Sequence, residues 1–288
     1  MHNMLHACFT TELVLSPKKN STVLVGSFDT GEMMKCSQVV LKKLHGSSTD
    51  IEKEIKNCKL VQKLAMQRGG HFCEIISVGT FQSIDSWVPH SESSICMRKY
   101  DMDLDALMNA SEAVDITTTR ITSWCACVSS TMQLLHEINM MHLDIKPQNL
   151  LFKHDTPDEL FLCDFGSMLE HGTLVHEQFV GTVQYASPEQ FKQKNVNLSS
   201  DVWAFGCILM QMLSRQPPWN GEQNNYKVYL RISNGEIPFD FNVACESDGE
   251  DAHALLVSTA RVCLQHDQEQ RPKFVTLSEH IERIRNCS

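Results

Sequence analysis

The spacing of hydrophobic residues in this chain changes near residue 100, from mainly strand-like to helical. Before that point, short runs rich in valine, leucine and isoleucine are separated by turn residues such as Pro17 and Asn20, which is typical of strands. The predicted strands are residues 11–16, 21–28, 38–44, 74–81 and 93–100. Residues 49–66 instead carry apolar side chains three and four apart, which predicts a helix capped by Thr49 or Asp50.

After residue 103 the apolar spacing becomes helical. The predicted helices are residues 121–135, 201–214, 252–264 and 277–286. A β-rich segment followed by a longer α-rich one indicates an α+β fold with a small N-lobe and a larger C-lobe, and 288 residues are enough for both. We expect the break near residues 98–103, and a cleft between two such lobes is a natural ligand site.

Composition excludes several classes of protein. Hydrophobic residues make up 42% of the chain, so disorder over most of its length is not expected. The net charge of −10 argues against a general binder of nucleic acid or of anionic membranes. The start lacks the pattern of a secretory leader, and no run approaches the roughly 18 apolar residues of a membrane span. We therefore expect a cytoplasmic location, with the nucleus as the alternative.

The 12 cysteines are scattered, and in a reducing compartment they would be free thiols. Cys125 and Cys127 form a CxC pair, but no second pair follows at the spacing of a zinc site. Because the pair lies in a helical pattern, we favour packing in the core over a metal site.

A short polar segment, HLDIKPQNLLF at residues 142–152, carries most of the chemical information. It places the carboxylate of Asp144, the ammonium of Lys146 and the carboxamide of Asn149 within six positions, just before an apolar run. Phosphoryl transfer to a hydroxyl requires that phosphates be held, that their charge be neutralised by metal, and that the hydroxyl be oriented. This segment supplies three of the polar groups for that work.

HLDIKPQN resembles the catalytic loop of eukaryotic-type protein kinases, DFG at residues 164–166 resembles their metal-binding motif, and VVLKKL at 39–44 resembles their third strand. GTVQYASPE, DVWAFG and QRPKF follow in the family's order. The resemblance runs over a predicted kinase domain at about 10–285. Its predicted parts are an N-lobe at about 10–98, a hinge at about 98–103 and a C-lobe at about 104–285.

The resemblance implies a role for each polar residue of these motifs. Asp144 and Lys146 would be catalytic: the first accepts or orients the substrate hydroxyl proton, and the second lies beside the transferred phosphoryl group. Asn149 and Asp164 would bind ATP through Mg²⁺. The implied cofactors are therefore ATP and Mg²⁺.

The small lobe would supply the remaining nucleotide contacts. Lys42 would contact the α- and β-phosphates and pair with an acid on the following helix, for which Glu54 is the choice and Glu52 the alternative. The other predicted ATP-binding residues are Lys18, Val23, Met97 and Lys99, of which Met97 falls at the gatekeeper position and Lys99 in the hinge.

The large lobe carries structural marks of the same family. Glu189 would pair with Arg271, and Asp201 would hydrogen-bond the backbone of the catalytic loop. Thr182 would bridge the catalytic Asp and Lys, which together with Lys146 indicates serine/threonine rather than tyrosine specificity. The remaining residues implied for this part are Phe165, against which the ring of His142 would pack, and Gly166.

The segment expected to cover the phosphates departs from the family. Residues 15–23 read LSPKKNSTV, so Ser16, Lys18 and Ser21 replace three glycines whose backbone N–H groups approach phosphate, and Pro17 removes one donor. Three interpretations stay open: Lys18 and its neighbouring lysine grip phosphate through their side chains, the segment binds ATP poorly and activity is weak, or it is a solvated basic turn.

The second departure is Leu143, where many kinases carry an arginine that answers a phosphate on the activation loop. Leucine cannot do so, and we predict that loop phosphorylation is not the switch. HLDxKP also resembles Mos-type kinases, and KYDMDL in a short chain resembles serine/threonine kinases of large DNA viruses.

The leading hypothesis is a serine/threonine protein kinase that transfers the γ-phosphoryl group of Mg-ATP to a protein Ser or Thr hydroxyl. The alternative is a pseudokinase, a binding scaffold with weak or no catalysis. A small-molecule kinase of related fold is disfavoured by the PE–Arg pair and the DVW helix start. The expected partners are protein substrates and a regulatory protein, without nucleic acid or membrane.

Overall fold

The computed structural model describes residues 8–18, 21–29, 36–82, 91–110, 115–173, 179–192, 196–241 and 251–287. The chain divides into two compact units. Unit 1 comprises Met1–Gln67 and Cys73–Tyr100, and unit 2 comprises Arg68–Phe72 and Asp101–Ser288. The first is rich in strands and the second in helices, so the predicted α+β fold is confirmed.

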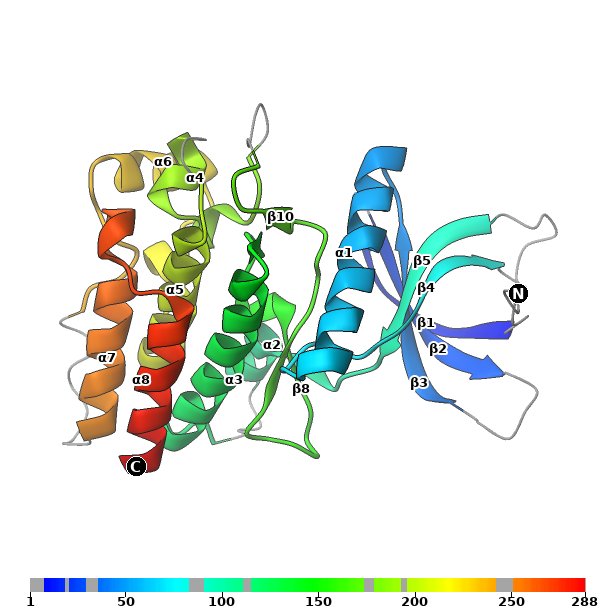
Figure 1. The fold of residues 1–288 in the computed structure, drawn as a ribbon, viewed down its shortest axis with the longest axis horizontal. Coiled ribbons are helices and arrows are strands. Elements are labelled where there is room, and N and C mark those ends of the chain that lie inside the picture. The colour runs from blue at the N-terminus through cyan, green and yellow to red at the C-terminus, as the bar shows by residue number, and fades with distance from the viewer. Residues whose placement is uncertain are drawn as a thin grey trace. The chain divides into compact units, whose positions relative to one another are not determined.

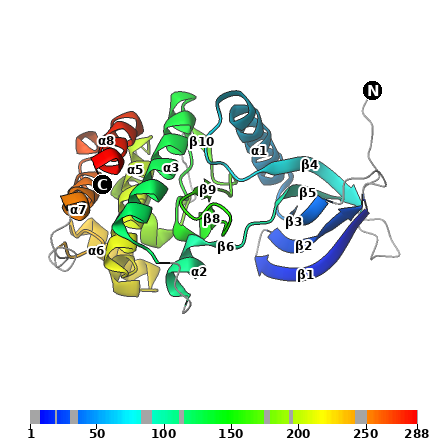
Figure 2. The same cartoon turned by 90° about the horizontal axis from the view of Figure 1, so that it is seen from below.

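Unit 1 is built on a five-stranded antiparallel sheet with the order β1–β2–β3–β5–β4 (Figures 1 and 2). Its strands are β1 (Cys8–Lys18), β2 (Ser21–Asp29), β3 (Cys36–Leu44), β4 (Ile75–Gln82) and β5 (Ser91–Arg98). Each predicted strand overlaps one of them. Val39 and Leu41, two apart on β3, lie on one face and form a buried cluster with Leu24 and Cys96.

Helix α1 (Ser48–Arg68) lies in unit 1 with this sheet. It buries Cys58, Val61 and Leu64 at helical spacing, as predicted. The Gln62 side chain donates to the backbone oxygen of Ile75 at 2.9 Å, which joins α1 to β4. The predicted cap is wrong. The helix begins at Ser48, so Thr49 and Asp50 already lie in its first turn.

The capping contact comes from Ser47, whose Oγ accepts a hydrogen bond from the Asp50 backbone N–H at 3.2 Å. The Asp50 carboxylate lies at the positive end of the helix dipole, which is also favourable. Several adjacent Ser, Thr and Asp residues were all plausible caps, and the pattern did not separate them.

Unit 2 is built on helices that lie side by side in Figure 1. Its longer helices are α3 (Thr118–Glu137), α5 (Ser199–Ser214), α7 (Asp251–Cys263) and α8 (Phe274–Cys287). Its shorter helices are α2 (Leu104–Asn109), α4 (Pro188–Lys192) and α6 (Asn225–Ser233). The four predicted helices of this part are confirmed, and α5 is buried along almost its whole length. None of the helices that the structure describes is both long and apolar enough to cross a membrane.

Short strands in unit 2 lead into the polar motifs. β6 (Met102–Asp103), β8 (Leu150–Phe152) and β9 (Leu160–Leu162) form one small sheet, and β7 (Met140–Met141) pairs with β10 (Leu169–Glu170). β7 ends just before His142, and β9 ends just before Cys163. The segment that contains Asp144 and the DFG motif therefore each begin where a buried strand ends, and the strand fixes the position of the backbone.

Nine cysteines are described as free thiols, and only Cys287 among them is exposed. The prediction that Cys125 and Cys127 pack in the core is confirmed, since both are buried. Burial raises the pKa of the Cys127 thiol to about 11. Because the thiolate is the reactive form, Cys127 is expected to be unreactive in the folded protein.

Candidate active site

The backbone before Asp144 is held in an unusual conformation. Leu143 has φ of 65°, a left-handed value that is rare for a bulky residue. The buried carboxylate of Asp201, near the start of α5, accepts hydrogen bonds from the backbone N–H groups of His142 at 2.9 Å and Leu143 at 2.7 Å. The strained turn persists because Asp201 fixes it from the core side.

Asp144 lies at the centre of a closed set of contacts. Its Oδ2 accepts from Lys146 Nζ at 2.8 Å, and its Oδ1 accepts from Thr182 Oγ1 at 2.6 Å. Lys146 Nζ also donates to Thr182 Oγ1 at 2.7 Å, which completes a triangle of three side chains. The Asp144 and Lys146 side chains are only 12% and 17% exposed, so the charge-assisted bonds hold the carboxylate in one orientation.

Asn149 joins the same group through its amide nitrogen. Nδ2 donates to the backbone oxygen of Asp144 at 2.8 Å and to the Asp144 carboxylate at 3.2 Å. These bonds leave Oδ1 as the atom that could ligate a cation. The Cys163 N–H donates to the Asn149 carbonyl at 3.0 Å, so Asp164 leaves the β8–β9 hairpin at the same end as Asn149.

The rest of the DFG motif packs into unit 2. Phe165 is buried, and its ring lies 5.9 Å from the His142 ring in an edge-on arrangement and 6.3 Å from the Phe72 ring. The expected packing of His142 against Phe165 is confirmed. Gly166 lies in the turn that follows. Asp164 itself has φ of 63°, a value that Asp tolerates better than most residues.

Unit 1 contributes a separate ion pair. Lys42 on β3 contacts Glu54 on α1 at 2.7 Å, with side chains 13% and 16% exposed. Of the two acids considered, Glu54 is thus the partner, and Glu52 is exposed. Val23 on β2 lies opposite Lys42 in the sheet register. The pair fixes the position of the ammonium group within unit 1.

The other predicted nucleotide contacts are less constrained. Met97 is half-buried on β5, opposite Val40. The Lys99 N–H donates to the Gln38 backbone oxygen at 3.3 Å and its Nζ to Gln38 Oε1 at 2.8 Å. Lys18 ends β1 opposite Ser21, and its side chain lies outside the described residues.

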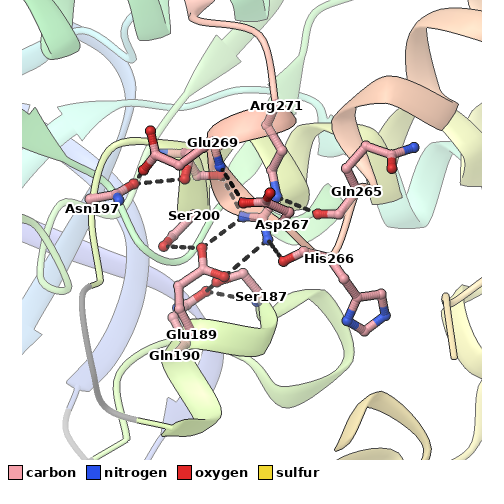
Figure 3. A network of polar contacts seen from close by, with 11 residues as sticks. Ser187, Glu189, Gln190, Asn197, Ser200, Gln265, His266, Asp267, Glu269 and Arg271 are labelled. Atoms are coloured by element: carbon pink, nitrogen blue, oxygen red, sulfur yellow. Dashed lines mark hydrogen bonds and ion pairs between the residues drawn. The ribbon is translucent and has the colours of Figure 1, made fainter. Parts of the chain in front are cut away.

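A buried ion pair supports the end of the activation segment (Figure 3). Arg271 donates from Nη1 and Nη2 to the two oxygens of Glu189 at 2.7 and 3.0 Å, and the Arg271 side chain is fully buried. Ser200 Oγ adds a third bond to Glu189 at 2.7 Å. Burial alone would raise the pKa of Glu189, but the bonds from Arg271 and Ser200 outweigh it and hold the pKa below its usual value.

The residues at the β8–β9 end fit Mg²⁺. Within the described ranges no cluster of three or more His, Cys, Asp or Glu side chains has the arrangement of a metal cage. Mg²⁺ does not require one, because it is usually bound through one or two carboxylates together with phosphate oxygens and water. Asp164 offers the carboxylate and Asn149 the amide oxygen, both hard donors.

Comparison with known proteins identifies the family. The profile described as "Protein kinase domain" matches residues 24–281. The chain belongs to the protein kinase family. The resemblance to eukaryotic-type serine/threonine protein kinases is therefore confirmed at the level of the family.

Curated relatives of this kinase include the serine/threonine-protein kinase PDK1 of Cryptococcus neoformans, 27% identical over 186 residues, which cover 62% of the chain and 14% of the relative. The human 3-phosphoinositide-dependent protein kinase 1 is 35% identical over 131 residues, or 44% of the chain and 22% of the relative. The kinase dlk-1 of Caenorhabditis elegans, a mitogen-activated protein kinase kinase kinase, is 29% identical over 171 residues, or 58% of the chain and 17% of the relative. The matched segments thus span less than a quarter of each of these relatives.

One contact of the kinase's activation segment was not anticipated. Gln190, directly after Glu189, is buried and its side chain bonds to the catalytic loop. The sequence offered little signal for it, because a single glutamine beside a recognised motif looks like a surface residue. Ser200, which supports Glu189, was missed for the same reason.

Proposed function

We propose that this domain is an active serine/threonine protein kinase that transfers the γ-phosphoryl group of Mg-ATP to a protein Ser or Thr hydroxyl. The observation that carries the proposal is the triangle of Asp144, Lys146 and Thr182. A carboxylate held by an ammonium group and a hydroxyl, with oxygen lone pairs remaining, can orient an incoming hydroxyl and accept its proton.

In this proposal each residue of unit 2 has one task. Asp144 orients the acceptor hydroxyl and receives its proton, and Lys146 stabilises the charge of the transferred group while it holds Asp144 in place. Thr182 keeps these two side chains in register. Asn149 and Asp164 hold Mg²⁺, which when bound neutralises the charge on the phosphates of ATP.

Residues of unit 1 would bind the nucleotide. Lys42, oriented by Glu54, is assigned to the α- and β-phosphates. Val23 and Met97 are assigned to the adenine ring by apolar contact. Two further nucleotide contacts, a side-chain contact from Lys18 and a backbone contact from Lys99, are assigned from the family pattern.

A second candidate function is a pseudokinase scaffold, and one observation favours it. β1 and β2 stay paired up to Lys18 and Ser21, so Ser16 and Pro17 lie in an extended hairpin opposite Val23 and Thr22. Residues 15–23 contain no glycine that would let the backbone approach phosphate closely, and Pro17 has no N–H to donate to phosphate. Such a hairpin would hold ATP weakly.

The test is transfer of labelled phosphate from ATP, with Mg²⁺, to a generic acceptor protein. Asp144→Asn keeps the size of the side chain but removes its basicity, and we expect the rate to fall about 10²- to 10⁴-fold. Asp158→Asn is the matched control, because this exposed acid pairs with Arg120 and lies outside the site. A folded parent with no transfer and no thermal stabilisation by Mg-ATP would favour the scaffold.

Removal of phosphate from the purified kinase should leave its rate unchanged within about twofold, because Leu143 offers no cation to a phosphorylated loop. The measurement is the transfer rate before and after treatment with a broad-specificity phosphatase that is then removed. Mass spectrometry must show that the phosphate is gone. A loss of tenfold or more would contradict the prediction.

We further propose that the acceptors are proteins with exposed Ser or Thr, that a regulatory protein acts on the domain, and that neither nucleic acid nor membrane is a partner. The net charge of −10 supports the last point. The cytoplasm, or alternatively the nucleus, is the proposed location, since free thiols are stable in a reducing compartment.

A further inference from the structure

Gln190 is the first residue after the Ser-Pro-Glu motif, and its side chain connects two segments far apart in the chain. Nε2 donates to the backbone oxygen of Leu143 at 3.3 Å and to that of Val180 at 3.0 Å. Oε1 accepts from the Ser187 N–H at 2.9 Å and from Ser187 Oγ at 3.0 Å. The residue is only 6% exposed, and all of its hydrogen-bonding capacity is directed inward.

These contacts meet at the strained residue before Asp144. The N–H of Leu143 is held by Asp201, and its carbonyl is held by Gln190. A left-handed leucine persists only where its surroundings fix it on more than one side. Asp201 supplies one side from the core, and Gln190 supplies the other from the activation segment.

The two segments also approach too closely for other side chains. Gly181 has φ of +107°, and a Cβ there would lie 2.4 Å from the Leu143 backbone oxygen and 3.1 Å from Gln190 Nε2. The next residue is Thr182, whose hydroxyl contacts Asp144. Gln190 therefore hydrogen-bonds Leu143 on the catalytic loop and Val180 on the activation segment. Both residues lie close in sequence to the pair formed by Asp144 and Thr182.

We propose that Gln190 is a positioning residue, which holds the activation segment on the catalytic loop through neutral hydrogen bonds and so keeps Thr182 on Asp144 without an added phosphate. The inference rests on the proposed function and deepens it, because it names what takes the place of an arginine–phosphate link. An amide suits this position because Nε2 can donate to two carbonyls while Oε1 accepts, and neither task needs a charge.

The test uses Gln190→Glu, which keeps the shape and the acceptor for Ser187. Its carboxylate would oppose the carbonyls of Leu143 and Val180, and we expect kcat at pH 8.5 to fall about 10- to 100-fold, the effect of a small misplacement at the reacting groups. Burial and the two carbonyls raise the pKa of a carboxyl there, so acidification protonates it and restores one donor. The deficit against the parent should shrink at least about threefold between pH 8.5 and 6.

Gln211→Glu is the matched control. Gln211 is 7% exposed on α5, and its Oε1 accepts from Tyr185 Oη, which a carboxylate also does. This variant buries the same new charge away from the segments that Gln190 joins, so its pH profile should follow that of the parent. A deficit of Gln190→Glu that is flat with pH, or a kcat within about twofold of the parent, would overturn the proposal.

Gln190→Leu provides an uncharged second variant. It should lower kcat about tenfold or more at every pH, with the KM for ATP unchanged. Hydrogen exchange of residues 179–182 should rise in both Gln190 variants and not in Gln211→Glu, and this readout needs no catalysis. Unchanged exchange sinks the inference, as does a failure of both Gln190 variants to fold, whereas an inactive parent with the expected exchange sinks only the proposed function.

Discussion

Asp164→Asn should lower kcat about 10³-fold, equivalent to about 4 kcal/mol of transition-state stabilisation. The change keeps the size of the side chain and removes the only negative charge assigned to the Mg²⁺ site. Asn149 then remains with a neutral amide oxygen, and two neutral oxygens do not compete well with water for Mg²⁺. The backbone should tolerate the change, because asparagine also accepts the φ of 63° found at this position.

A thermal-shift measurement separates this role from general damage. The parent should be stabilised more by ATP with Mg²⁺ than by ATP with a chelator, since a ligand that binds only the folded state raises Tm. Asp164→Asn should lose that difference, while Asp144→Asn should keep it because Asp144 is not assigned to metal. If Asp164→Asn keeps both its transfer rate and its Mg²⁺-dependent shift, the assignment of Asp164 is wrong.

Glu189→Gln should destabilise unit 2 by about 3–5 kcal/mol, because it leaves the guanidinium group of Arg271 buried without its counter-charge. For a unit of this size the expected fall in Tm is roughly 6–20 °C. Glu282→Gln is the matched control, because Glu282 pairs with Arg285 on the solvent-facing side of α8 and both side chains are more than a third exposed. Exposed pairs contribute about 0–1 kcal/mol, so this control should melt close to the parent.

The same pair predicts how stability depends on pH. Because the folded-state pKa of Glu189 lies below its usual value, its contribution is present above the pKa of the unfolded state and is lost as pH falls through the folded value. Chemical denaturation at pH 7 and at about pH 4 should therefore show a smaller acid-induced loss in Glu189→Gln than in the parent. Equal losses in the two proteins would contradict the prediction.

The sequence predicted the elements whose signal is repeated many times. β3 and α5 carry long apolar patterns, and burial of those faces decides their structure whatever their neighbours do. The motifs located Asp144, Lys146 and Thr182, and the structure brings these side chains together. The N-cap of α1 depended on one hydroxyl among several, so it was placed incorrectly.

Gln190 shows a different limit. Its partners are backbone oxygens at Leu143 and Val180 and a hydroxyl at Ser187, and no side-chain type marks a backbone oxygen in a sequence. Such a contact forms only because the fold brings two segments together, and Gln190 and Leu143 are 47 positions apart in the sequence. The close approach of the two segments also requires Gly181, because a Cβ there would collide with the Leu143 backbone oxygen. The sequence did not indicate the conformation of this glycine either.

The doubly held backbone of Leu143 has a consequence for anyone who would redesign this domain as a phosphate-controlled enzyme. Replacing that leucine with arginine would add a cation that could bind a phosphoryl group. In the proposed arrangement, however, Gln190 already holds the activation segment in place in the unphosphorylated protein. The unphosphorylated protein would first have to be made inactive by removing hydrogen bonds of the Gln190 side chain. Only then could a contact between the arginine and a phosphate restore activity.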